Sequence, residues 1–298
     1  MPTRTKPLNV SLVGAGKVGT TLAVLLHRRG HKISSIISRS LPDARRCAAR
    51  VRCTTFSTLI SDLAPATELL MIATPDEAIR DLSELICRSA SLQFRRLRVF
   101  HTSGALTSDE LQAFAGMGAR TFSLHPVQTF PRGISIEQQL AAMKGISYGF
   151  EGSREMKPFG SKLARELGGK IFPVPKEEKV LYHLACVFAS NYSVALLGAV
   201  DDLAAEFIAG PRLQHFRKLI EMSVRSAVRS SPGEALTGPI ARGSSKIVAL
   251  HLEQVRRRKD LDLLYRAIGL YALKITRRAN KISSRQASVL RKILSKGG

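Results

Sequence analysis

Short apolar runs alternate with amphipathic stretches through the first 174 residues of the chain. The run at 8–13 is followed by apolar residues at helical spacing as far as residue 29, and a second run covers 31–38. Runs of this length, separated by helical segments, predict parallel strands joined by crossover helices. The same pattern predicts further strands at 68–73, 97–100, 119–123, 145–150 and 170–174, with a helix over 155–167.

From residue 175 onward, the apolar positions follow a helical period almost throughout. The predicted elements are a long helix over 177–209, a helix begun by the capping box at 231–234, an interruption at 236–243, helices over 246–257 and 260–274, and a fraying tail after Arg277. The predicted fold class is therefore α/β, a Rossmann-type doubly wound sheet followed by an all-α C-terminal domain. A chain of 298 residues suits two domains, which we place at 1–174 and 175–298.

A glycine motif, GAGKVG at 14–19, follows the first predicted strand without a gap and opens the first predicted helix. Gly30 stands where a helix C-terminal glycine belongs, ahead of the second strand. This order within about 30 residues is the dinucleotide-binding fingerprint, in which small residues let the backbone approach a pyrophosphate at the helix N-terminus. A helix–strand turn that binds nothing is the plain alternative. The predicted contacts at this turn are Gly14, Ala15, Gly16, Lys17, Val18 and Gly19.

The residue about 20 positions beyond the last glycine contacts the adenosine ribose in such folds, and a carboxylate there selects NAD. This chain has Arg39 at that place, flanked by Ser38 and Ser40. A guanidinium between two hydroxyls suits a 2′-phosphate. The sequence therefore favours NADP over NAD, with a merely basic surface residue as the alternative.

Two further turns follow predicted central strands, and strand C-termini of such sheets line the ligand crevice. We expect these turns to face the nicotinamide half of the cofactor, although plain caps and turns would have the same pattern. Asp76 is predicted to cap the helix that begins near residue 77. The predicted contacts are Ala73, Thr74 and Pro75 in the first turn, and Thr102, Ser103 and Gly104 in the second.

Composition changes this picture little. The net charge of +23 permits nucleic-acid binding, but the basic residues are scattered and lack interleaved aromatic residues, so we do not expect that function. The stretch 180–200 has no charged residue and the length of a membrane span, yet its His, Ser and Asn residues favour a helix buried in a soluble protein. The four cysteines show no zinc-ligand spacing and are expected to be reduced, and no signal peptide precedes the first strand, which indicates a cytoplasmic protein.

Polar residues in the long predicted helix are the candidate catalytic groups. His183, Val187, Ser190 and Val194 share one stripe, with Asn191 at its edge. They either are satisfied by other helices or face a substrate cleft near the nicotinamide, and we prefer the cleft. The other candidates are His125 before a proline, as an alternative proton donor to His183, and Thr237 and Arg242, as ligands of an anionic substrate group.

These motifs together resemble those of the Rossmann-like oxidoreductases that carry a C-terminal helical domain of unknown function. More distantly, the chain is similar to pyrroline-5-carboxylate reductase, ketopantoate reductase and the 3-hydroxyacid dehydrogenases. The resemblance rests on GAGKVG at 14–19, SR at 38–39, TPD at 74–76, HTSGAL at 101–106, HP at 125–126, YH at 182–183, SN at 190–191 and LTGPIARG at 236–243. The family has Asp and Thr where this chain has Ser244 and Ile247, which puts turnover in doubt.

The resemblance implies an NADP-dependent oxidoreductase that reduces a small carbonyl or imine metabolite. Separately, we expect the helical second domain to form a homodimer. A dinucleotide-binding or sensing protein without turnover is the second hypothesis, and a basic nucleic-acid-binding protein is the third. The fold alone does not supply the substrate.

Overall fold

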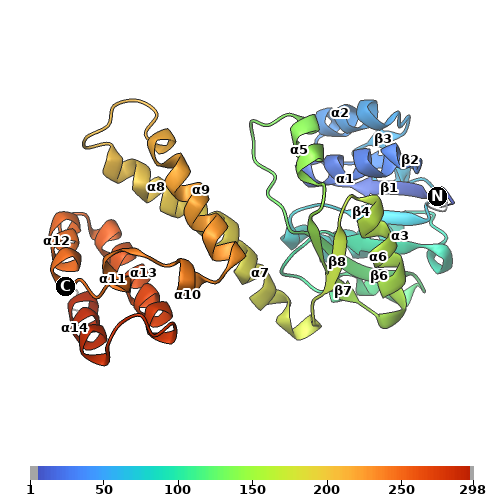
Figure 1. The fold of residues 1–298 in the computed structure, drawn as a ribbon. Helices are drawn as coiled ribbons and strands as arrows, with labels where there is room; N and C mark the ends of the chain where they lie inside the picture. The colour runs from blue at the N-terminus through green and yellow to red at the C-terminus, as the bar shows by residue number, and fades with distance from the viewer. Residues whose placement is uncertain (1–5, 296–298) are drawn as a thin grey trace. The chain divides into compact units, whose positions relative to one another are not determined.

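The computed structural model describes residues 6–295, which form two compact units divided after Tyr192 (Figure 1). The first unit is built on one eight-stranded sheet with the strand order β3-β2-β1-β4-β5-β6-β7-β8. This confirms the predicted α/β class. The strands are β1 (Asn9–Val13), β2 (Lys32–Ile37), β3 (Phe56–Ser57), β4 (Leu69–Ile72), β5 (Arg98–His101), β6 (Arg120–Pro126), β7 (Ser147–Gly152) and β8 (Lys170–Pro173).

The sheet is doubly wound. The central strand β1 pairs in parallel with β2 on one side and with β4 on the other, so the order in which strands are added reverses at β1. All pairings are parallel except that of β6 with β7. Each strand predicted from the apolar pattern is present. The edge strand β3 was not predicted, because two residues are too few to show a period.

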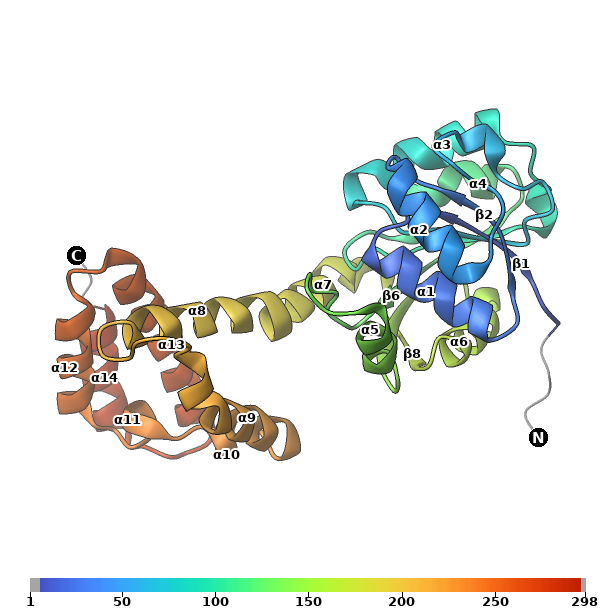
Figure 2. The same cartoon turned by 90° about the horizontal axis from the view of Figure 1, so that it is seen from above.

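Helices cover both faces of this sheet (Figure 2). On one face Leu22 and Leu163 belong to the same apolar core as Phe122, and on the other face Ile86 and Phe114 pack in a core with Val99. The first face carries α1 (Lys17–Arg28), α2 (Leu41–Val51), α5 (Ile136–Ala142) and α6 (Lys157–Glu166), and the second carries α3 (Ile79–Ser89) and α4 (Gln112–Gly116). Short 3-10 turns are η1 (Ile60–Asp62), η2 (Asp76–Ala78), η3 (Phe94–Arg96), η4 (Ser108–Leu111), η5 (Arg154–Met156) and η6 (Lys176–Glu178).

The long helix predicted over 177–209 is present only in interrupted form. It consists of α7 (Lys179–Val187), a π-helical turn η7 (Phe188–Tyr192) and α8 (Ser193–Ala204). A π turn has wider hydrogen-bond spacing and includes one extra residue, so it rotates the residues that follow it relative to those before it. The sheet ends at Pro173, whereas the first compact unit continues to Tyr192, so the domain boundary at residue 174 stays a prediction.

The expectation that this helix is buried is wrong for the single chain. Lys176–Ala204 is long and apolar enough to cross a membrane by length and composition, and its most apolar 18-residue window, with a mean hydropathy of 1.5, is not buried. The side chains of Val180, Leu181 and Val194 are 71%, 61% and 67% exposed.

The second unit is entirely helical in its regular structure. Its core joins Val248 and Leu252 to Leu273 and Leu290. The four cysteines of the chain all lie in the first unit and form no disulfide. The helices after α8 are α9 (Leu213–Arg229), α10 (Pro232–Ala235), α11 (Gly238–Ala241), α12 (Ser245–Val255), α13 (Lys259–Arg278) and α14 (Ser284–Ser295).

Three expectations for this unit need correction. Of the predicted capping box only one half forms: Ser231 Oγ accepts from the backbone N–H of Glu234, while the Glu234 carboxylate accepts from the Ser231 hydroxyl, and α10 has only four residues. A short helix, α11, lies inside the segment predicted to interrupt the helices. As far as residue 295, where the described chain ends, the basic tail is helical rather than frayed, because α14 buries Leu290 and Leu294 and the Arg266 guanidinium donates to the Ile293 carbonyl oxygen.

Candidate functional site

The glycine turn between β1 and α1 is shaped by close backbone contacts. Gly14 has φ +100°, and a Cβ there would lie 2.5 Å from the Ala73 carbonyl oxygen. A Cβ on Gly19 would lie 2.1 Å from the Gly14 carbonyl oxygen. Gly16 differs, because a Cβ on it would meet nothing within 4 Å. Gly14 and Gly19 therefore fix the turn, while Gly16 faces open space at the N-terminus of α1.

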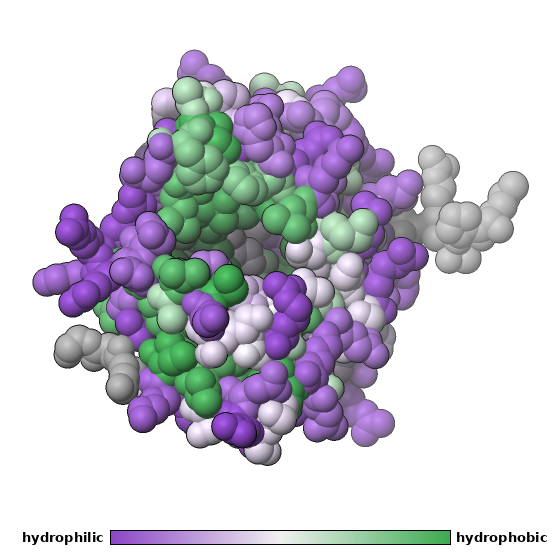
Figure 3. All heavy atoms as spheres, turned by 60° about the vertical axis from the view of Figure 1, so that its left-hand side comes forward, coloured by the Kyte–Doolittle hydropathy of each residue, from purple (hydrophilic) through white to green (hydrophobic). Residues whose placement is uncertain are grey.

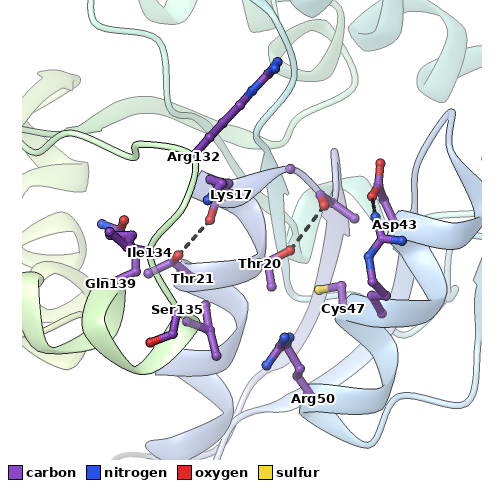
Figure 4. Close-up of a pocket in the computed structure, with 14 residues that line it drawn as sticks. Lys17, Thr20, Thr21, Asp43, Cys47, Arg50, Arg132, Ile134, Ser135 and Gln139 are labelled. Carbon is purple, nitrogen blue, oxygen red and sulfur yellow. Dashed lines mark hydrogen bonds and ion pairs between the residues drawn. The ribbon is translucent and has the colours of Figure 1, made fainter. Parts of the chain in front are cut away.

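A pocket of about 570 Å³ opens at this turn and is called the glycine-turn pocket (Figure 4). Gly16 is the N-cap of α1, and no side chain caps that helix. The Lys17 side chain is turned aside, since its Nζ donates to the Pro131 carbonyl oxygen at 2.7 Å. The lining residues are Ala15, Gly16, Lys17, Thr20, Thr21, Asp43, Arg46, Cys47, Arg50, Arg132, Ile134, Ser135, Ile136 and Gln139. An uncapped helix N-terminus beside several cations suits a phosphate group.

At the C-terminal end of β2, the three residues predicted to contact the adenosine ribose differ in their freedom. Arg39 is exposed, and the described part of the chain gives it no hydrogen bond or ion pair. Ser40 Oγ accepts from the Asp43 N–H at 3.3 Å and so caps α2, while the Ser38 N–H donates to the Ser57 carbonyl oxygen. Of these three side chains, Arg39 can therefore bind a ligand without first breaking a hydrogen bond or an ion pair.

The turns after β4 and β5 lie beside the glycine turn. The close approach of Gly14 to Ala73 brings the first turn there, and the Thr102 N–H donates to the Ile72 carbonyl oxygen. Thr74 Oγ1 is buried and has no partner in the structure. A buried hydroxyl without a partner is costly, so this atom fits a site that a bound group completes.

The predicted capping role of Asp76 is wrong. Pro75 is the N-cap of η2 and no side chain caps that turn. The Asp76 carboxylate instead accepts from Ser103 Oγ at 2.8 Å, and Ser103 Oγ in turn accepts from the backbone N–H groups of Ala105 and Leu106. Asp76 therefore ties the turn after β4 to the turn after β5, which a local sequence pattern does not show.

A second pocket, of about 440 Å³, lies beyond the end of β6 and is called the histidine pocket. His125 Nδ1 and the Tyr182 hydroxyl share a hydrogen bond of 2.6 Å, and the rings of His125 and His183 meet edge to face at 6.1 Å between centroids. Ser190 Oγ lies 2.8 Å from both the Cys186 carbonyl oxygen and Asn191 Oδ1. The lining residues are His125, Val127, Gln128, Thr129, Phe130, His183, Cys186, Val187, Ala189, Ser190 and Asn191, none of which is acidic or basic apart from the histidines.

Two glycines make room for these rings. A Cβ on Gly104 would lie 2.6 Å from His183 Cδ2 and 3.0 Å from His125 Nε2. A Cβ on Gly149 would lie 2.5 Å from the Tyr182 hydroxyl oxygen. Gly104 therefore joins the predicted nicotinamide turn directly to the histidine pocket.

Burial sets the protonation of this pocket. It lowers the pKa of His125 to about 3, with smaller contributions from the charges of Lys179, His183 and His101. Burial also raises the pKa of Tyr182 well above its usual range. At neutral pH His125 is an uncharged imidazole that shares a hydrogen bond with a protonated phenol.

The structure places three of the five predicted catalytic residues in one pocket: His125, His183 and Asn191. Thr237 and Arg242 are the N-cap and C-cap residues of α11 in the second unit, and their part in the site stays a prediction. Sequence reasoning gave no role to Lys179, Tyr182, Gln128 or Thr129. A signal for Lys179 was available, because it lies one helical turn before His183, directly ahead of the uncharged stretch 180–200.

Comparison with known protein families accounts for both halves of the chain. Residues 2–126 match the model of a Rossmann-like domain, and residues 146–272 match a domain of unknown function, DUF2520. The chain combines a Rossmann-like domain with a DUF2520 domain. The DUF2520 match begins one residue before β7 and includes β7, β8 and the histidine-bearing helix α7.

Solved structures share this arrangement. A Bacteroides fragilis protein described as a candidate NADP oxidoreductase is 23% identical, with a TM-score of 0.75 over 89% of this chain and 98% of its own. A Thermotoga maritima protein is 25% identical, with a TM-score of 0.70 over 91% and 99%. A pyrroline-5-carboxylate reductase from Coxiella burnetii is 15% identical, with a TM-score of 0.56 over 94% and 100%. No curated protein sequence matches the chain. These similarities establish a common fold.

Proposed function

We propose that this chain is an NADP-dependent oxidoreductase, soluble and cytosolic, that reduces a small carbonyl or imine compound. The observation that carries the proposal is the glycine-turn pocket, where Gly16 leaves open space at the uncapped N-terminus of α1. The buried, unpartnered Thr74 hydroxyl and the free Arg39 guanidinium fit the same ligand. The solved relatives described as NADP oxidoreductase and pyrroline-5-carboxylate reductase support the reaction class.

In this proposal each part of a bound cofactor has its own residues. The pyrophosphate is held by backbone N–H groups of the glycine turn, and the 2′-phosphate by Arg39 with the Ser38 hydroxyl. The turns that contain Thr74 and Ser103 hold the nicotinamide half. When bound, NADPH supplies the hydride.

The histidine pocket then holds the acceptor. Its neutral lining and its place beside Gly104 suit an uncharged or anionic carbonyl or imine. His125, kept uncharged and fixed by Tyr182, orients the acceptor through its second ring nitrogen, and His183 is the proposed proton donor. Asn191 supplies an amide hydrogen bond from the π turn, and π turns recur at functional sites.

Arg39→Ala is expected to remove the preference for NADPH over NADH. Ligand binding to the folded state stabilises it by about 2.7 kcal/mol at a hundredfold excess over the Kd, so NADPH should raise the Tm of the unmodified protein more than NADH does. The measurement is the Tm with each cofactor. Arg88→Ala is the control, because Arg88 lies on α3 on the other face of the sheet, pairs with Glu84 and should leave the preference intact.

Equal Tm shifts with the two cofactors in the unmodified protein would contradict the NADP assignment. NADPH binding without oxidation across a panel of small ketones and imines would favour the dinucleotide-sensing alternative. Oligonucleotide binding that falls steeply with salt would favour the nucleic-acid alternative.

We also propose that the protein is a homodimer formed along its exposed helices. The 17-residue helix α9 has no buried residue, and its Leu219, Met222 and Val228 are 67%, 60% and 80% exposed. Apolar side chains also gather on the face shown in Figure 3. Large apolar side chains left exposed along a helix favour an interaction surface. Because 180–200 carries no charged residue, two copies can pair there without repulsion despite the net charge of +23.

Val194→Glu is expected to weaken this dimer about a hundredfold, since an unpaired carboxylate buried in an apolar interface costs about 3 kcal/mol. Light scattering at micromolar concentration measures the mass. Leu59→Glu is the control, because Leu59 is similarly exposed, at 60%, but lies before η1 in the first unit. A monomer in the unmodified protein, or its binding to lipid vesicles through this surface, would contradict the proposal.

A further inference from the structure

A lysine is buried at the start of α7, close to the turns proposed to hold the nicotinamide. Lys179 is 1% exposed and ranks among the largest fully buried side chains of the described chain. Lysine is almost never fully buried, because the ammonium loses its hydration. Burial lowers the pKa of Lys179 to about 8, so the ammonium is still mostly charged at neutral pH.

The ammonium makes two hydrogen bonds, one to a side chain of β6 and one to the turn after β5. Lys179 Nζ donates to Ser123 Oγ at 2.9 Å and to the Ser103 carbonyl oxygen at 3.2 Å. Ser123 Oγ also donates to that carbonyl oxygen, at 3.2 Å. The positive charge therefore lies directly behind the turn that follows β5, at the end of the sheet where ligands of doubly wound folds bind.

Neighbouring carboxylates do not pair with this charge. Asp76 accepts from Ser103 Oγ, while Glu151 accepts from the Ser108 backbone N–H at 2.6 Å and from Ser108 Oγ at 2.9 Å. Both raise the pKa of Lys179 through space, as does Cys186, but no ion pair joins them to it among the described residues. The local positive potential is therefore only partly offset.

Two buried histidines and a buried tyrosine near Lys179 are uncharged at pH 7. Burial lowers the pKa of His101 to about 4 and that of His125 to about 3, and in both the Lys179 charge contributes. The Tyr182 ring centroid lies 5.7 Å from Nζ, and burial raises the pKa of its phenol. His183 stands one turn along α7 and packs against His125. Among these groups, Lys179 is the one whose buried positive charge lies against the Ser103 turn.

We propose that Lys179 is a positioning residue that makes the site prefer the reduced cofactor, an inference that rests on the proposed function. The oxidised nicotinamide ring carries a positive charge and the reduced ring carries none. An ammonium behind the Ser103 turn repels the oxidised ring alone. At an effective dielectric constant near 20, repulsion between unit charges across roughly 10 Å changes a binding constant about tenfold. The site would therefore retain NADPH and release NADP⁺, as a reductase requires.

The test compares the Kd of NADPH with that of NADP⁺, measured by calorimetry without any acceptor. We expect the unmodified protein to prefer NADPH, and Lys179→Met to reduce the ratio of the two constants about tenfold. Lys176→Met is the matched control, because Lys176 is exposed one turn earlier and pairs with Asp109 at the surface. General loosening of the fold would weaken both cofactors together and leave the ratio unchanged.

The ratio should also depend on pH in a way that a purely structural lysine cannot produce. Below pH 7 Lys179 is charged and the preference for NADPH is complete. As the pH rises through about 8 the ammonium loses its proton and the preference falls, whereas in Lys179→Met the ratio should stay level. Lys179→Gln keeps an N–H donor near the Ser103 carbonyl and serves if the methionine variant does not fold.

The outcomes separate this inference from the function on which it rests. If neither cofactor binds, the proposed function fails and the inference with it. If both cofactors bind with a ratio that is independent of pH and unchanged in the Lys179 variants, the inference is overturned while the function stands. If no Lys179 variant folds, the pH series on the unmodified protein decides.

Discussion

Gly16→Ala is expected to leave the thermal stability of the protein unchanged while weakening NADPH binding by about a hundredfold. A Cβ on Gly16 meets no atom within 4 Å, and the residue has φ −71°, which alanine adopts without strain. The added methyl group would instead occupy the space into which the pyrophosphate must come. Unfolding curves with and without NADPH measure the two effects.

Gly19→Ala is the matched comparison, with the opposite expected result. Its Cβ would lie 2.1 Å from the Gly14 carbonyl oxygen and 3.0 Å from Leu12 Cδ1, so α1 would have to move away from β1. Overpacking of this kind costs roughly 1–3 kcal/mol or more, which should lower the Tm without any ligand. Unchanged NADPH affinity in Gly16→Ala would show that the open space at this turn is not the cofactor site.

Asn191→Ala is expected to lower turnover by roughly a hundredfold and to leave NADPH affinity unchanged, as loss of one positioned hydrogen-bond donor commonly does. Asn191 lines the histidine pocket with His125 and His183, and its Oδ1 lies 2.8 Å from Ser190 Oγ, which fixes the amide. The measurement is NADPH oxidation with an acceptor that the unmodified protein reduces, together with the Tm shift produced by NADPH.

Gln254→Ala is the control for that variant, because it removes an exposed amide from α12 in the second unit. Unchanged turnover in Asn191→Ala would show that Asn191 does not supply the proposed hydrogen bond to the acceptor. Equal losses of turnover and NADPH affinity would indicate instead that Asn191 contacts the cofactor.

The sheet was predictable because buried parallel strands are nearly continuous apolar runs. Val10, Leu12 and Val13 in β1, like Leu69 to Ile72 in β4, are fully or almost fully buried, and that burial is what the pattern recorded. The glycine turn was predictable for a different reason. Gly14 and Gly19 satisfy local steric requirements that other residues cannot meet, so residue type and spacing alone carry the signal.

The helical half was predicted less well, because its pattern depends on partners that the sequence does not name. The apolar stretch 180–200 was expected to be buried, yet its Val180, Leu181 and Val194 side chains stay exposed in the single chain. Helical periodicity also gave no sign of the π turn at Phe188–Tyr192, since one extra residue shifts the stripe without breaking it. The tail was expected to fray, but Leu290 and Leu294 find a core formed by distant helices.

The sequence by itself determined the α/β class, the glycine turn and the arginine at the end of the second strand, because each depends on residues close together in the chain. Only the tertiary structure decided that Lys179 is buried against Ser103 and Ser123, and that Tyr182 bonds His125. Those contacts join residues 56, 57 and 76 positions apart, and a side chain's protonation depends on which distant groups surround it. Local pattern therefore predicts the cofactor turn, whereas the chemistry of the pocket beside it follows from packing.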